Sequence, residues 1–206
     1  MLRRMSAAGA GCLLALAAGA AMAAPADSPA ADGLPAFDCA GPFARDASEA
    51  SLAARFGARN VVFRTVPGAE GTSFKATVLF PRDPARRVEI AWKDEKRRRR
   101  PQHVSVAAAS RWMTAEGLGV GSSLAAVEAA NGRPFTMAGF GWDYGGTVTD
   151  WNGGRLARPG CRLLLRLEPT PGAPADDVDG DRDFRSDAPA MRAAKPVIYE
   201  MMLVFE

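Results

Sequence analysis

Apolar positions after residue 45 show a helical spacing first and strand-like runs afterwards. Asp46-Ala47-Ser48-Glu49 provides a capping acceptor and an acid three residues on, which is typical of a helix start. Leu52 and Phe56 lie four residues apart on one apolar face, and Gly57 ends the helix. The strand-like runs that follow, separated by Pro, Gly and charged residues, are 60–66, 73–80, 88–92 and 103–107.

The same order of elements begins again after residue 120. Residues 123–130 predict a second short helix, with Leu124 and Val127 on its apolar face and Asn131-Gly132 at its end. Strand-like runs then fall at 134–140, 147–151, 161–167 and 197–205. A long polar stretch, 169–195, separates the last two runs.

The repeated order predicts an α+β fold made of two tandem units, 37–112 and 113–206. Each unit is a short helix plus a four-stranded antiparallel sheet, with the helices covering one face. Ser51-Leu52-Ala53-Ala54 and Ser123-Leu124-Ala125-Ala126 agree with a duplication, although Ala-rich tetrapeptides also recur by chance. Two such sheets set side by side would form one long sheet whose other face is open to a partner.

The N-terminus has the three parts of a secretory signal. Arg3 and Arg4 precede an apolar run, 7–21, which ends at Ala21-Met22-Ala23, a small-residue cleavage pattern. We expect a signal peptide over 1–23, then a disordered leader over 24–36 that is rich in Ala, Pro, Asp and Ser. Cleavage leaves a periplasmic or secreted protein without a transmembrane segment, and an uncleaved anchor is the alternative.

Removal of the signal changes both the charge and the cysteine count. The net charge falls from +3 to +1, so the chain has no general attraction for nucleic acid. Two cysteines remain, Cys39 and Cys161, and an even pair in an oxidising compartment predicts a disulfide. The alternative is two buried thiols.

The second helix and its flanks carry a resemblance to a known family. This segment resembles the repeat opening of the β-lactamase-inhibitor-protein-like fold through Gly119-Val120-Gly121-Ser122-Ser123-Leu124, then Val127, then Asn131-Gly132-Arg133-Pro134. Outer-membrane assembly lipoproteins of the SmpA/OmlA type have a similar opening. The match covers some 25 residues and is degenerate in the first unit. The resemblance implies a non-enzymatic, extracytoplasmic protein that binds another protein through its sheet.

The candidate partner-binding residues are Trp142, Asp143, Tyr144 and Trp151, in a segment rich in glycine. Large rigid rings are typical anchors of protein interfaces. We expect the three rings to lie near one another, at least one of them substantially exposed, with Asp143 at the rim. The alternative places these rings in the core, with glycines in the tight turns.

Other motifs carry little chemistry. His103 is the only histidine, so a multi-histidine metal site is impossible, and a hydrolase would have to use it. Residues 177–183 resemble the start of a calcium loop, but Arg182 and Ala188 replace its turn glycine and bidentate acid, so we expect weak or absent calcium binding. The basic run 93–100 predicts a solvated hairpin loop. We expect no metal and no cofactor.

Charge is distributed unevenly between two segments. Residues 82–100 hold nine Lys or Arg and four Asp or Glu, whereas residues 168–187 hold two Arg and seven acids. These segments could attract each other or steer a dipolar partner. The sequence predicts an exported binding protein that engages a protein or envelope partner without catalysis. The alternatives are a periplasmic hydrolase using His103 and a purely structural envelope protein.

Overall fold

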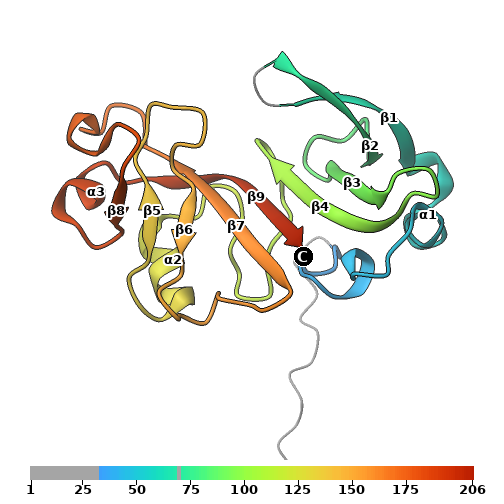
Figure 1. Ribbon diagram of the computed structural model, residues 1–206, viewed down its shortest axis with the longest axis horizontal. Coiled ribbons are helices and arrows are strands. Elements are labelled where there is room, and N and C mark those ends of the chain that lie inside the picture. Colours follow the sequence, from blue (N-terminus) through green and yellow to red (C-terminus); the bar gives the residue numbers. More distant parts are fainter. Residues whose placement is uncertain (1–32, 69–70) are drawn as a thin grey trace, which may run out of the picture.

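The computed structural model describes residues 33–68 and 71–206, which fold into two antiparallel sheets and three short α-helices (Figure 1). The large sheet has the spatial order β1 (Val61–Pro67), β2 (Ser73–Leu79), β3 (Val88–Asp94), β4 (Arg99–Ala107), β9 (Val197–Phe205) and β7 (Cys161–Glu168). The small sheet has the order β6 (Val148–Asp150), β5 (Thr136–Ala138) and β8 (Asp183–Arg185). The helices are α1 (Glu49–Phe56), α2 (Leu124–Asn131) and α3 (Pro189–Ala193). The fold class is α+β.

The two longer helices begin and end through the same local chemistry. The Ser48 hydroxyl accepts from the amide of Ser51 at the start of α1, and the Ser123 hydroxyl accepts from the amide of Ala126 at the start of α2. The capping residue of α1 is therefore Ser48 and not Asp46. Both helices end at a glycine with positive φ, 84° at Gly57 and 81° at Gly132.

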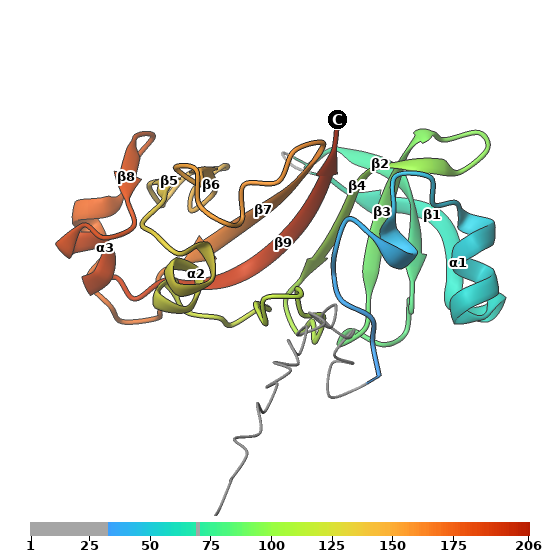
Figure 2. The ribbon, with the colours of Figure 1, turned by 90° about the horizontal axis from the view of Figure 1, so that it is seen from below.

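The two faces of the large sheet have different surroundings. One face, which we call the core face, carries large apolar side chains that belong to the main hydrophobic cluster, including Ile90, Val104, Leu163, Leu165, Met201 and Leu203. Leu52 of α1 and Leu124 and Val127 of α2 join the same cluster. Figure 2 looks at the sheet from this side, with α2 and the chain after residue 33 in front of the strands and α1 at the β1 end.

The chain before α1 covers part of the core face. Phe43 packs edge-on against Trp112, with 5.3 Å between ring centroids, and Phe37 packs against Phe43. A disulfide joins Cys39 of this segment to Cys161 of β7, as the sequence predicts. The signal segment and most of the expected leader lie outside the described residues, but Leu34, at the end of that leader, is buried in the core.

The second part of the chain departs from the single four-stranded sheet expected for it. β7 and β9 complete the large sheet, whereas β5 and β6 pair with β8 in a separate one. The two sheets meet at an isolated bridge between Thr147 and Arg166. Beyond this bridge they diverge, and the Trp151 indole donates to the Leu163 carbonyl oxygen at 3.2 Å. A tandem repeat is therefore not established by the strand pattern.

The polar stretch 169–195 is more ordered than its composition predicts. It contains β8 and α3, and β8 pairs with β5 so that Phe184 lies opposite Met137. Elements this short leave no periodic signal in the sequence. Among the helices that the structure describes, none has the length and apolar character needed to cross a bilayer.

Candidate functional site

The face opposite the core face, which we call the open face, carries a continuous row of side chains across all six strands of the large sheet. The row is Val62, Val78, Glu89, Ser105, Met202 and Leu164, each paired with the next across the sheet. Most of its members are apolar, and Met202 and Leu164 are only half-buried. The helices that cover the sheet lie on its other side (Figures 1 and 2).

A small hydrophobic cluster lies on the open face near the β1–β2 hairpin. Val66, Ala76 and Val78 are buried there, and Phe74 packs against them. Phe74 also meets the His103 ring edge-on, with 5.6 Å between centroids. Val62, at the other end of β1, is 39% exposed. The open face therefore combines packed and exposed apolar side chains, an arrangement typical of interaction surfaces.

The segment 140–146 forms an aromatic hairpin beside the end of β7. Trp142 and Tyr144 are in edge contact, with 5.6 Å between their centroids. The Trp142 indole donates to the Gly139 carbonyl oxygen at 3.1 Å, which fixes the ring, whereas Tyr144 is 57% exposed. Asp143, between them, is exposed. Two of the three predicted rings therefore lie together, and one of them is open to solvent.

Arg166 of β7 holds this hairpin against the large sheet. Its Nη2 donates to the carbonyl oxygen of Asp143 at 2.6 Å, and its Nη1 donates to the Glu200 carboxylate at 3.4 Å. The guanidinium also lies 5.2 Å from the centre of the Tyr199 ring. Gly146 is required at the base of the hairpin, since its φ is 72° and a Cβ there would collide with the Leu167 carbonyl oxygen.

Burial changes the pKa of three groups on the open face. It raises the pKa of the Glu200 carboxyl, an effect that the nearby Arg166 partly offsets, and it raises the pKa of Tyr199. Burial also lowers the pKa of His103 below its ordinary value of 6.5, against a smaller opposite influence of Glu89. Tyr199 and Glu200 lie beside the aromatic hairpin, next to Arg166, whereas His103 lies near the β1–β2 hairpin against Phe74.

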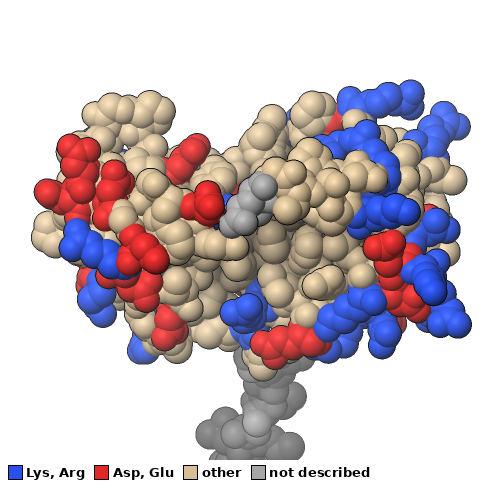
Figure 3. Space-filling model, turned by 45° about the horizontal axis from the view of Figure 1, so that its top comes forward, with Lys and Arg blue, Asp and Glu red and all other residues tan. Residues whose placement is uncertain are grey.

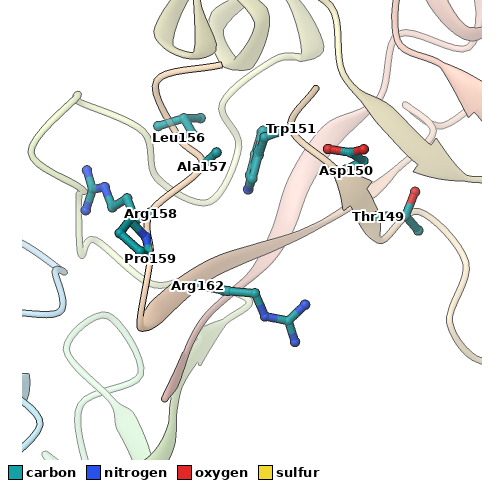
Figure 4. Close-up of a pocket in the computed structure, with 8 residues that line it drawn as sticks. All are labelled: Thr149, Asp150, Trp151, Leu156, Ala157, Arg158, Pro159 and Arg162. Atoms are coloured by element: carbon teal, nitrogen blue, oxygen red, sulfur yellow. The ribbon is translucent and has the colours of Figure 1, made fainter. Parts of the chain in front are cut away.

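Trp151 belongs to a different place from the Trp142–Tyr144 pair. Its ring packs against Phe135, with 5.4 Å between centroids, and it is half-buried. It lines a hollow of about 420 Å³ where β6 and β7 diverge, together with Leu156, Pro159 and Arg162 (Figure 4). The expected cluster of three rings is therefore a pair plus a separate ring, because the Trp151 indole bonds to β7.

Charge separates across the molecule. The first part, 37–112, holds 15 Lys or Arg and 8 Asp or Glu, a net charge of +7, and the second part, 113–206, holds 9 and 13, a net charge of −4. Figure 3 looks obliquely onto the open face, with acids gathered on one side, bases on the other and an uncharged middle. Such a dipole orients an approaching partner.

His103 lies on the open face among apolar neighbours. It pairs with Ala91 on one side and Val204 on the other. Its imidazole makes no hydrogen bond or ion pair with any of the described residues. A general base needs a second group to orient it and a substrate proton within reach. The geometry therefore adds no observation in favour of a hydrolase.

The remaining charged motifs have ordinary positions. The basic run 93–100 forms the β3–β4 hairpin and its turn, in which Arg98 pairs with Glu49 at 3.0 Å. In the acidic segment, Arg182 donates to the Asp177 carbonyl oxygen at 3.0 Å. The part of the chain that the structure describes contains no group of three or more His, Cys, Asp or Glu placed to hold a metal ion.

The residues that complete the site are Leu164, Arg166, Met202 and Glu200, which the sequence analysis did not single out. β9 is almost continuously apolar, which is typical of a strand buried on both faces, so its sequence does not show which side is open. No protein-family model, curated protein or solved structure matches the chain. The structure is that of an α+β protein with two antiparallel sheets, an open face on the large sheet and an aromatic hairpin beside it.

Proposed function

We propose that this chain is an exported, non-enzymatic binding protein that engages a protein partner with its open face and aromatic hairpin. The observation that carries the proposal is the row of side chains across six strands, which ends in the half-buried Met202 and Leu164 while the helices pack on the core face. Exposed apolar surface that is held rigidly by a sheet supports an interface better than it supports solubility alone.

Export follows from the signal pattern over 1–23 and agrees with the disulfide between Cys39 and Cys161. An oxidising compartment forms and keeps such a bond. The partner would then be a secreted protein or a component of the cell envelope, which places the protein in an inhibitor-like or envelope-assembly-like role. The resemblance of 119–134 to repeats of that kind agrees with this role.

A duplicated origin of the two parts is also proposed. The last strands of the two parts, β4 and β9, pair antiparallel at the centre of the large sheet. α1 and α2 share a serine cap and a terminal glycine. Divergence of β5 and β6 from β7 would account for the break in the second part.

Complementary charge selects the partner in this proposal. The basic first part and the acidic second part flank an uncharged middle, so the partner would present an apolar patch between an acidic and a basic region. Association should then be faster at low ionic strength, since screening weakens charge steering over about 10 Å at 0.1 M salt.

Site-specific cross-linking in the producing cells tests this function. A photoreactive phenylalanine analogue at Met202 or Tyr144 should give a discrete cross-linked protein, and the same analogue at the exposed Ala54 of α1 should not. The product from Tyr144 should disappear when Leu164→Lys is added, with the melting temperature measured to confirm folding. No product from either position, or an equal product from Ala54, contradicts the proposal.

A further inference from the structure

A second hollow, of about 430 Å³, lies between the aromatic hairpin and the end of β7. Its walls include Trp142, Asp143, Arg166, Glu168 and Tyr199. The Trp142 ring meets the Tyr144 ring at 69°, and Tyr144 lies next to the hollow and is not part of its lining. Aromatic faces carry partial negative charge and attract cations within about 6 Å of the ring centre.

The charged groups of this hollow differ in whether they already have a partner within the protein. Arg166 is already engaged by Asp143 O, by the Glu200 carboxylate and by the Tyr199 ring, whereas its Nε is buried without a hydrogen-bond partner in residues 33–68 and 71–206. The carboxylates of Asp143 and Glu168 are exposed, and no ion pair within the described residues involves them. The charge of Arg166 is therefore paired with Glu200, whereas the carboxylates of Asp143 and Glu168 have no cationic partner in the described part of the chain.

The wider surroundings have the same sign. Residues 168–187, which start at this hollow, carry seven acids and two arginines. An anionic ligand would meet both free carboxylates, and an apolar side chain would desolvate them without a partner, which is costly. A cation satisfies the carboxylates and the rings together.

We propose that this hollow receives an arginine or lysine side chain of the protein partner, held between Trp142 and the carboxylates of Asp143 and Glu168. The inference rests on the proposed function and adds the chemistry of one contact. It places the basic region of the partner at the aromatic hairpin. The acidic region of the partner would then lie toward β1–β4, because the first part of the chain is basic. The Arg166–Tyr199 contact is an internal example of the same chemistry.

Titration by NMR tests the proposal on the full mature protein. The probes are N-acetyl-arginine methylamide and the corresponding citrulline compound, which keeps the shape and lacks the charge. The Trp142 indole N–H, which is hydrogen-bonded to Gly139 O, should shift with arginine and stay unchanged with citrulline. The indole of Trp151, in the other hollow, provides an internal reference. Equal shifts from both probes, or none, overturn the proposal.

Two matched carboxylate variants identify the site. Glu168→Gln should weaken arginine binding by about threefold to fivefold, the effect expected for one exposed ion pair next to a ring. Asp176→Asn removes an exposed acid from the same acidic segment without touching the lining and should change binding less than twofold. Equal losses in the two variants mean general charge attraction, and they overturn the site.

Cross-linking from Met202 separates this inference from the proposed function. If Met202 gives its product and the arginine probe does not bind, the hollow is not a cation site and the binding function stands. If neither Met202 nor Tyr144 gives a product, the binding function fails, and with it the assignment of the cation to a protein partner. Loss of the Met202 product in Glu168→Gln protein, at unchanged melting temperature, supports both.

Discussion

The two faces of β7 and β9 both carry large apolar side chains, but these side chains are buried to different degrees. Leu165 and Leu203 on the core face are fully buried, whereas their neighbours Leu164 and Met202 on the open face are half-buried. The difference comes from what lies over each face. α1, α2 and the disulfide-linked segment cover the core face. On the open face, charged side chains such as Arg166 and Glu200 lie next to the apolar ones. An apolar strand residue is thus core or surface depending on elements distant in sequence.

Removal of the disulfide should have the largest effect on stability, because this bond joins the segment before α1, which covers part of the core face, to β7. Replacing both Cys39 and Cys161 with alanine should lower the free energy of unfolding by about 4–5 kcal/mol, the value for a closed loop longer than about 100 residues. Urea denaturation of the mature protein measures this loss, and reduction of the wild-type protein should reproduce it. A loss below about 1 kcal/mol would mean that packing alone holds the segment in place.

Leu165 and Leu164 provide a matched pair with a smaller effect. Leu165→Ala leaves a cavity in the core and should cost about 2–5 kcal/mol. Leu164→Ala removes a half-buried side chain that makes fewer contacts and should cost about 1 kcal/mol or less. Thermal or chemical denaturation of both variants compares them directly. Equal costs would show that the open face is packed in solution and is not available to a partner.

His103 should give the smallest effect, visible only as a pH dependence. Its pKa is lowered in the folded protein by burial, so the unfolded chain binds a proton more readily. The free energy of unfolding should therefore fall as pH decreases from about 6.5 toward the lowered value, and His103→Gln should remove this part of the slope. Urea denaturation between pH 8 and pH 5 measures it. Parallel slopes in both proteins would place His103 in a more hydrated environment than its contacts with Phe74 indicate.

Sequence reasoning located the local elements well. Both predicted helices form, and each of the eight predicted strands has a counterpart in the structure. The largest shift is at β4, which begins at Arg99 and not at 103, because Asp94 and Arg99 extend the ladder into the charged run. Charged residues at the end of a hairpin are as compatible with a strand as with a loop, so composition alone does not place this boundary.

The candidate site was predictable only in part. The Trp142–Tyr144 pair and its exposure follow from two rings among glycines, because glycines cannot cover a neighbouring ring. The separation of Trp151 did not follow, since it depends on one hydrogen bond from its indole to Leu163 O. Arg166 gave no local signal because its partners, Asp143, Tyr199 and Glu200, come from other parts of the chain.

The sequence by itself determined the class α+β, the two short helices with their glycine ends, the strand runs and the pairing of two cysteines. These depend on local spacing, turn chemistry and parity, which act within a few residues. Only the tertiary structure decided that β9 joins β4 to β7, that β5 and β6 leave the large sheet, and that one face stays open. Those outcomes depend on long-range packing, because strand pairing and helix docking join residues far apart in sequence, and a strand such as β9 with apolar residues on both sides does not by itself specify which side is buried.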